Sequence, residues 1–230
     1  MLEYMYLWIC ILLFIPWGII YYFRPLLRNR LVKSGLIALP FAFIDDIWFR
    51  VDYWNAPEIF SIYPIAIEDL LFCFVISGIS ITVFDALFTK EQIPTYKPRT
   101  KLTLSFFPIT ITSFIILHNI LGINSMYMWA IPCFVLSVVV LLIRRDLILP
   151  SLISATIVTL IIIPIYMILF NIFAPDFWDT YWFLKDTKHG ITILGNVALL
   201  ELLYYFSFAS IASIMYDFAK GTTKVYKKLF

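Results

Sequence analysis

Residues 64–88 read PIAIEDLLFCFVISGISITVFDALF and place Glu68, Asp69 and Asp85 in a stretch that is otherwise almost wholly apolar. A helix rises about 1.5 Å per residue, so about 20 apolar residues cross a hydrocarbon core of about 30 Å. The stretch is long enough to do this. It is therefore predicted to be a membrane-spanning helix that carries three acids.

The rest of the chain has the same character, because 62% of its 230 residues are hydrophobic and only 14% are charged. In soluble domains, nearer half of the residues are hydrophobic and about a quarter are charged. We therefore predict an all-α fold, a polytopic bundle of seven transmembrane helices in which residues 1–230 form a single transmembrane domain. The first span is long and aromatic, so we expect it to belong to the fold and not to be a cleaved signal. The predicted spans are residues 3–23, 31–49, 64–88, 102–121, 126–143, 148–173 and 191–217.

The basic residues support this topology, because Lys and Arg collect in the cytoplasmic connections of membrane proteins. Three of the 17 fall on one side of the predicted bundle, at Arg50, Lys185 and Lys188. The other 14 fall on the opposite side, so we expect a multi-pass protein of the cell membrane with its N-terminus outside and its C-terminus in the cytoplasm. The net charge of +2 then reflects topology and gives no case for nucleic-acid binding. The 14 are Arg24, Arg28, Arg30, Lys33, Lys90, Lys97, Arg99, Lys101, Arg144, Arg145, Lys220, Lys224, Lys227 and Lys228.

An internal repeat is visible in the third and seventh spans. Residues 66–74, AIEDLLFCF, align without a gap with residues 198–206, ALLELLYYF, and the same offset places Asp85 over Asp217. Each span thus carries two acids separated by the same interval, and chance similarity between two apolar segments does not readily explain this match. We predict a parallel three-helix repeat, with residues 1–88 as the first copy, 89–125 as a connecting span and 126–230 as the second. Repeats of this kind commonly enclose a site at their interface.

Acids within membrane spans are candidates for function, because each costs about 2.5 to 3.5 kcal/mol on insertion scales. Asp69 aligns with Glu201, Glu68 is adjacent to Asp69, and Asp46 ends the second span at the same outer level. Buried carboxyls that lie close together can hold a proton, and such a group can act as a general acid. The candidate catalytic residues are Glu68, Asp69, Glu201 and Asp46.

Asp85 and Asp217 are interpreted differently. Asp85 lies about 24 Å along the helix from Asp69, so the two cannot share a site. Both residues fall at the cytoplasmic ends of their spans, close to basic residues. We expect them to form helix-end salt bridges or hydrogen bonds.

Aromatic residues make up 19% of the chain, and four of them, Trp48, Phe72, Tyr204 and Tyr205, lie beside the candidate acids. Most Trp and Tyr in membrane proteins belong to interfacial belts. These four are candidates for substrate binding, since aromatic faces can stabilise a nearby cation.

Other kinds of site have no signature in the sequence. The three cysteines fall inside predicted spans, and the two histidines lack ligand-like spacing, so no metal site is expected. The glycines form no nucleotide-binding pattern. The seventh span contains no lysine between residues 191 and 217, and a retinal Schiff base would need one there.

At the aligned residues the chain resembles the membrane-embedded lycopene cyclases of the heterodimeric or fused type, whose halves each carry a Pro-x-Glu-Glu-x-x-Phe-Phe-like motif. Residues 66–73 read AIEDLLFC and residues 198–205 read ALLELLYY. Ala66 and Ala198 replace the motif proline, and Leu200 replaces the first acid of the second copy.

The resemblance implies a flavin-free, acid-catalysed ring closure at the end of a linear, lipid-soluble carotenoid such as lycopene, within the membrane and without a cofactor. It assigns proton donation to Glu68 or Asp69. It assigns proton acceptance or cation stabilisation to Glu201 and Asp46. Partners would be membrane lipid and the carotenoid, with a homo-oligomer or other carotenoid enzymes also compatible with the sequence.

Two other functions fit the same features. A small proton-coupled transporter would also carry intramembrane acids and parallel repeats. A non-catalytic carotenoid-binding or partner subunit is suggested by the acid lost at Leu200.

The charge distribution makes a direct prediction about topology. In a variant without native cysteines, Lys185→Cys should react with a membrane-impermeant maleimide on intact cells, whereas Lys97→Cys should react only after permeabilisation. Labelling of the second variant on intact cells would contradict the seven-span topology.

Overall fold

The computed structural model describes residues 2–59, 61–62 and 65–227, and all their side chains except those of Asp45, Asp46, Ser61, Ile62 and Ile65. It is 76% helical. Within the described residues, six helices are long and apolar enough to cross a membrane, as expected of a multi-pass membrane protein. They are Leu2–Phe23, Ile67–Phe88, Thr100–Ile120, Ser125–Ile143, Arg145–Phe173 and Leu199–Lys220.

Each long helix contains one regular α-helix, and several continue into tighter or wider turns. Asn124 shows one local cause of a helix start, because its side chain accepts the Met126 N–H at 3.1 Å. The regular helices are α1 (Met5–Phe23), α4 (Ile67–Phe88), α5 (Thr100–Phe114), α6 (Ser125–Ile143), α7 (Ile148–Met167) and α9 (Leu199–Lys220). The attached turns are η1 (Leu2–Tyr4), η5 (Ile115–Ile120), η6 (Arg145–Leu147) and η7 (Ile168–Phe173).

The second predicted span, residues 31–49, is helical but irregular and is not one of the six. Pro40 has no N–H to donate and crowds the preceding turn, and a 3₁₀ turn replaces the α-helix around it. The elements of this segment are η2 (Pro25–Leu27), α2 (Arg28–Ala38), η3 (Leu39–Ala42), η4 (Asp45–Phe49) and α3 (Arg50–Asp52).

Three small antiparallel sheets, each of two strands, occur in the described residues. The all-α prediction did not include them. Four of the strands have only two residues and leave no periodic pattern in the sequence, and the two longer strands, β3 and β6, lie in segments outside the predicted spans. Two sheets are hairpins directly before α4 and α9, and the third joins the other ends of these helices. The pairs are β1 (Ser61–Ile62) with β2 (Ile65–Ala66), β4 (Thr192–Ile193) with β5 (Val197–Ala198), and β3 (Thr89–Pro94) with β6 (Thr222–Tyr226).

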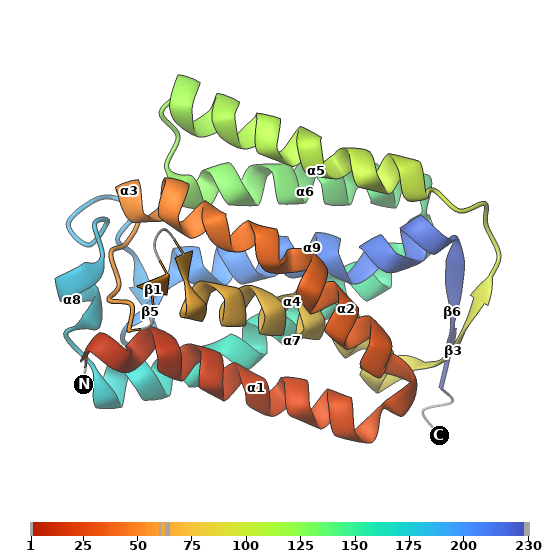
Figure 1. Cartoon of the computed structure of the whole chain (residues 1–230), viewed down its shortest axis with the longest axis horizontal. Helices are drawn as coiled ribbons and strands as arrows, with labels where there is room; N and C mark the ends of the chain where they lie inside the picture. The colour runs from red at the N-terminus through yellow and green to blue at the C-terminus, as the bar shows by residue number, and fades with distance from the viewer. Residues whose placement is uncertain (1, 60, 63–64, 228–230) are drawn as a thin grey trace.

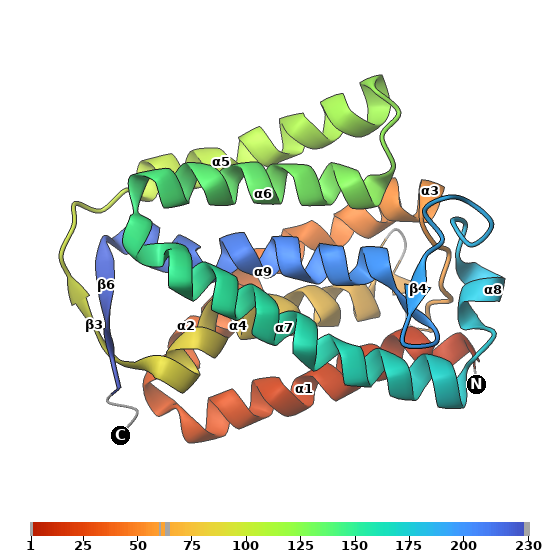
Figure 2. The ribbon, with the colours of Figure 1, turned by 180° about the vertical axis from the view of Figure 1, so that it is seen from behind.

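The helices α4 and α9 form the centre of the bundle. The most apolar windows of their spans are 67% and 61% buried, against 11% for the span that contains α5. Helices α1 and α2 pack on α4, and α6 and α7 pack on α9, while α5 lies outside α6 (Figures 1 and 2). The acids of α4 and α9 are therefore in the interior of the protein.

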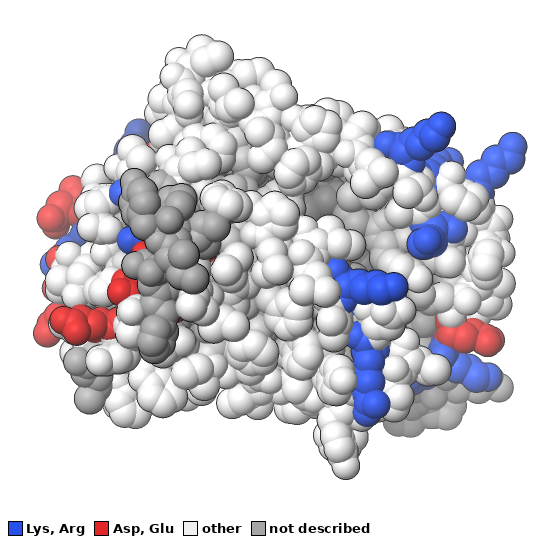
Figure 3. All heavy atoms as spheres, viewed as in Figure 1, with Lys and Arg blue, Asp and Glu red and all other residues white. Residues whose placement is uncertain are grey.

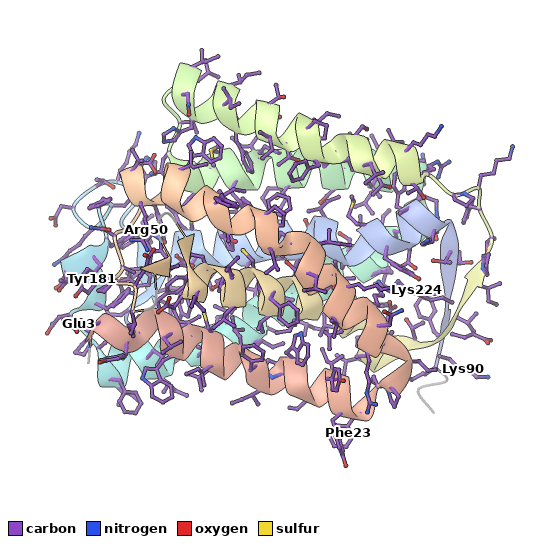
Figure 4. The ribbon with its side chains drawn as sticks, viewed as in Figure 1. Glu3, Phe23, Arg50, Lys90, Tyr181 and Lys224 are labelled. Carbon is purple, nitrogen blue, oxygen red and sulfur yellow. The ribbon has the colours of Figure 1, made fainter. Side chains whose placement is uncertain are left out.

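The two ends of the bundle differ in charge. The N-terminus lies at the end that holds the β1–β2 and β4–β5 hairpins and α8 (Phe177–Tyr181), which we call the hairpin end. The C-terminus lies at the opposite, β3–β6 end (Figure 1). On the face that Figure 3 shows, Lys and Arg gather mainly at the β3–β6 end and acidic side chains mainly at the hairpin end. Figure 4 places Glu3, Arg50 and Tyr181 at the hairpin end and Lys90 and Lys224 at the other.

Asp85 and Asp217 are buried at the β3–β6 end, where they form one ion cluster. Lys224 Nζ lies 2.5 Å from Asp85 Oδ1 and 2.6 Å from Asp217 Oδ2. Arg30 Nη1 lies 2.5 Å from Asp85 Oδ2. The Gln92 amide donates to both carboxylates at 3.0 Å. The expectation that these two acids form helix-end salt bridges is thus confirmed.

Two arginines complete this end. Every helix leaves carbonyl oxygens without partners at its C-terminus, and these arginines donate N–H groups to carbonyls there. Arg24 donates to the carbonyl oxygens of Asp85 and Thr89 at 3.1 and 3.0 Å, at the end of α4. Arg144 donates to the Thr222 carbonyl at 2.7 Å, just past the end of α9. Positive charge is also favoured at these positions by the helix dipole.

The ion cluster predicts a strong dependence of stability on Lys224. Lys224→Met leaves two buried carboxylates with Arg30 as the nearest cation, and breaking a buried pair costs about 3–5 kcal/mol. We expect a matching fall in the free energy of unfolding, measured by denaturation of the purified protein in detergent.

Lys90→Met is the matched control, because Lys90 is an exposed lysine in the same sheet and should change stability by less than about 0.5 kcal/mol. The double variant Asp85→Asn/Lys224→Met should recover part of the loss, since it removes one charge of each sign. Equal stability of the two lysine variants would contradict the role given to the cluster.

Candidate functional site

A cavity of about 60 Å³ lies between the hairpin-end halves of α4 and α9. Helices α1, α6 and α7, the turn η3, and the residues Ile44, Phe49 and Trp54 supply the rest of its wall. Asp69 and Glu201 both line it. A space of this size holds several water molecules, so the two carboxyls share one small chamber inside the bundle.

Asp69 stands in the first turn of α4, directly after the extended Ala66 at which the hairpin ends. It is 1% exposed. The Tyr6 hydroxyl, from α1, donates to Asp69 Oδ1 at 2.5 Å. This hydrogen bond fixes one oxygen of the carboxyl.

Glu201 occupies the matching place in the first turn of α9 and is held by two phenols. Tyr53 donates to Oε1 at 2.7 Å and Tyr166 donates to Oε2 at 2.9 Å. The Tyr166 oxygen also lies 3.0 Å from that of Tyr205. Burial raises the pKa of Tyr53 well above its usual value, and the charge of Glu201 raises it further. Tyr53 therefore stays protonated and serves Glu201 as a donor throughout the physiological pH range.

Aromatic rings form much of the remaining wall. The Phe72 ring lies 6.3 Å from that of Tyr204 and 6.0 Å from that of Tyr205, centroid to centroid. Trp129, from α6, stacks on Tyr204 at 5.0 Å. The negative faces of such rings attract cations, so the chamber combines two carboxyl groups with surfaces that can stabilise positive charge.

The cavity brings together five of the eight residues proposed from the sequence, namely Asp69, Glu201, Phe72, Tyr204 and Tyr205. Glu68 does not line it. Its Oε1 accepts the Ile59 N–H at 2.9 Å, which ties the loop before the hairpin to α4.

Trp48 is also away from the cavity lining. Its Nε1 donates to Asn119 Oδ1 at 2.9 Å, and its ring packs edge-on against Phe114. The side chain of Asp46 lies outside the described residues, so only its backbone is placed, within η4.

Sequence reasoning missed four residues of the site: Tyr6, Tyr53, Tyr166 and Trp129. Tyr166 offered the clearest signal, because a phenol deep inside the predicted span 148–173 needs a hydrogen-bond partner when buried. Tyr6, Tyr53 and Trp129 lie near span ends, where an interfacial belt explains them equally well. Their partners become visible only when the helices are packed.

The titratable groups of the cavity lining are carboxyls, phenols and the Cys73 thiol. Within the part of the chain that the structure describes, no three His, Cys, Asp or Glu side chains are grouped so that they could hold a metal ion. Comparison with family models, curated proteins and solved structures found no match to this chain. The arrangement can donate a proton to an apolar molecule in the chamber and accept one from it.

The hydrogen bonds to Glu201 predict how its substitution affects stability. Glu201→Leu removes the acceptor from two buried phenols, and each buried polar group left unsatisfied costs about 1–3 kcal/mol. Glu201→Gln keeps one carbonyl acceptor and should lose less. Thermal unfolding of the purified proteins in detergent should show the wild type as the most stable, Glu201→Gln as less stable and Glu201→Leu as the least stable. Equal stability of the two variants would contradict this prediction.

Proposed function

We propose that this protein catalyses the acid-catalysed ring closure of an end group of a linear carotenoid, such as lycopene, within the membrane. The observation that carries the proposal is that Asp69 and Glu201, from two different helices, line one buried chamber walled by aromatic rings. A membrane-dissolved hydrocarbon offers no polar group to bind. The chemistry available on it is addition and removal of protons, which this chamber is equipped to perform.

The two carboxyls are related by the proposed three-helix repeat. An offset of 132 residues relates Asp69 to Glu201, Phe72 to Tyr204 and Cys73 to Tyr205, and all six residues line the cavity. Both central helices also have 22 residues, begin after a hairpin and end at a strand. These correspondences support a duplicated unit, residues 1–88 and 126–230, joined by residues 89–125.

The position at which the second copy lacks an acid also supports Asp69 and Glu201 as the catalytic pair. Leu200 aligns with Glu68, whose carboxyl accepts a loop N–H and does not line the cavity. Glu201 aligns with Asp69, and both carboxyls face the chamber. The loss at Leu200 is thus compatible with catalysis, because it falls at the position that does not reach the site.

The topology is part of the proposal. The termini lie at opposite ends of the bundle (Figure 1), which requires an odd number of crossings, so the irregular segment from α2 to α3 serves as the seventh. The basic β3–β6 end is then cytoplasmic by the positive-inside rule. The N-terminus is outside, the cell membrane is the proposed location, and the chamber lies toward the outer leaflet.

The reaction begins when the Asp69 carboxylic acid adds its proton to the terminal alkene of the substrate, which leaves a tertiary cation. The electron pair of the next double bond attacks this cation, a ring C–C bond forms, and the positive charge moves into the ring. Glu201 carboxylate then removes a ring proton, and the C–H electron pair becomes the ring double bond. Phe72 and Tyr204 present their faces to the charge. The product is an isomer of the substrate, and transfer of one proton from Glu201 to Asp69 restores the site.

The chamber must widen for this substrate, because pockets for drug-sized ligands measure about 300–1,000 Å³ and this cavity measures about 60 Å³. Phe41 and Ala42 contribute to its wall from η3, the 3₁₀ turn at Pro40. A turn without regular α-helical hydrogen bonds is the part of the wall that moves at least cost. We infer that the end group enters from lipid at this turn.

The test is pigment extraction from cells that make lycopene, with and without this chain. Wild type should yield cyclised carotenoid. Asp69→Asn and Glu201→Gln should fold but cyclise about 10²–10⁴ times more slowly, the usual contribution of a general acid or base. Glu68→Gln should retain far more activity, since its amide oxygen can still accept the Ile59 N–H. If the wild-type chain formed no rings, a proton-coupled carrier or a non-catalytic carotenoid-binding subunit would replace the proposal.

A further inference from the structure

The Glu201 carboxylate is fixed from two sides by segments that are far apart in the sequence. Tyr53, which follows α3, holds Oε1, and Tyr166, on α7, holds Oε2. Both tyrosines are 1% exposed. With a donor on each oxygen, the carboxylate cannot rotate without breaking a charge-assisted hydrogen bond.

Each phenol is itself held in place. The Tyr166 ring packs edge-on against Phe170 at 5.0 Å, and its oxygen contacts the Tyr205 hydroxyl. The Tyr53 N–H donates to the Phe49 carbonyl at 2.9 Å, and its own carbonyl accepts the Phe183 N–H at 3.0 Å. The orientation of Glu201 is thus determined by the packing of three separate segments.

Orientation matters for the last step of the proposed reaction. After ring closure, the tertiary cation is flanked by several non-equivalent C–H bonds. Loss of a proton from each of them gives a different position for the new double bond. In each of these alternative deprotonations, the electron pair of the broken C–H bond becomes the double bond and the base gains one proton. The base that lies closest to one C–H bond therefore determines which isomer forms.

Resting on the proposed cyclisation, we propose that Tyr53 and Tyr166 are positioning residues that aim the Glu201 carboxylate at one ring C–H bond and so determine where the ring double bond forms. Tyr6 performs the corresponding task for Asp69 at the proton-adding step. That step precedes the choice of isomer. The two groups of tyrosines should therefore affect different properties of the reaction.

Tyr53→Phe and Tyr166→Phe each remove one hydroxyl and keep the ring. In cells that make lycopene, both variants should produce a mixture of ring double-bond isomers, separated by chromatography and assigned by NMR. The ratio of isomers should shift severalfold and the rate should fall by about tenfold or more, since a base displaced by about 1 Å can cost 10²-fold. The isomer ratio does not depend on how much protein folds, so a merely structural defect would leave it unchanged.

Two further variants serve as controls. Tyr6→Phe should slow ring formation with the isomer ratio unchanged. Tyr127→Phe removes a hydroxyl that contacts His189 and is not part of the cavity lining, so it should leave both rate and ratio unchanged.

An unchanged isomer ratio in Tyr53→Phe and Tyr166→Phe, with wild-type cyclisation intact, would overturn the positioning role and leave the proposed function standing. A shifted ratio in Tyr127→Phe would also overturn it, because the shift would then follow from any lost hydroxyl. Absence of ring formation by the wild type would instead overturn the proposed function itself.

Discussion

The fold depends on the cost of keeping carboxyl groups inside an apolar bundle. Helices α4 and α9 each carry acids near both ends, and an ionised carboxylate without partners is very expensive in such surroundings. Each acid must therefore meet a donor from another part of the chain. Tyr6 and Tyr53 supply donors at the hairpin end, and Arg30 and Lys224 supply them at the β3–β6 end. These contacts tie α1, α2, β6 and the loop that holds Tyr53 to the central pair.

The chemistry of the donors separates the two ends. Arg30 and Lys224 carry full positive charges, so they form ion pairs with Asp85 and Asp217 and balance their negative charge. A phenol donates a hydrogen bond but brings no charge. The carboxyls of Asp69 and Glu201 are thus oriented by hydrogen bonds, and the proposed reaction assigns proton transfer to them. One pair of helices then carries an ion cluster at one end and the proposed site at the other.

Sequence reasoning identified the candidate acids but not the tyrosines that hydrogen-bond to them. The depth of Asp85 along its span predicted a helix-end role, and the gapless alignment predicted that Asp69 and Glu201 act together; the first is confirmed and the second stays a prediction. Tyr53 could not have been paired with Glu201, because 148 residues separate them and no periodicity links a loop phenol to a distant helix. Pro40 signalled the break in the second span, which a count of apolar residues overlooked. The four two-residue strands leave no pattern in the sequence.

The hydrogen bonds also bear on whether one proposed half can act alone. Tyr53 belongs to residues 1–88 but holds Glu201, which belongs to residues 126–230. The chamber wall crosses the same boundary, since Phe72 contacts Tyr204 and Tyr205. At the other end, Lys224 from the second half neutralises Asp85 of the first. The first half thus supplies a donor to Glu201 of the second, and the second supplies a cation to Asp85 of the first. Each of these acids also keeps a partner from its own half, Tyr166 for Glu201 and Arg30 for Asp85, so pairing of the proposed halves adds a second partner to each.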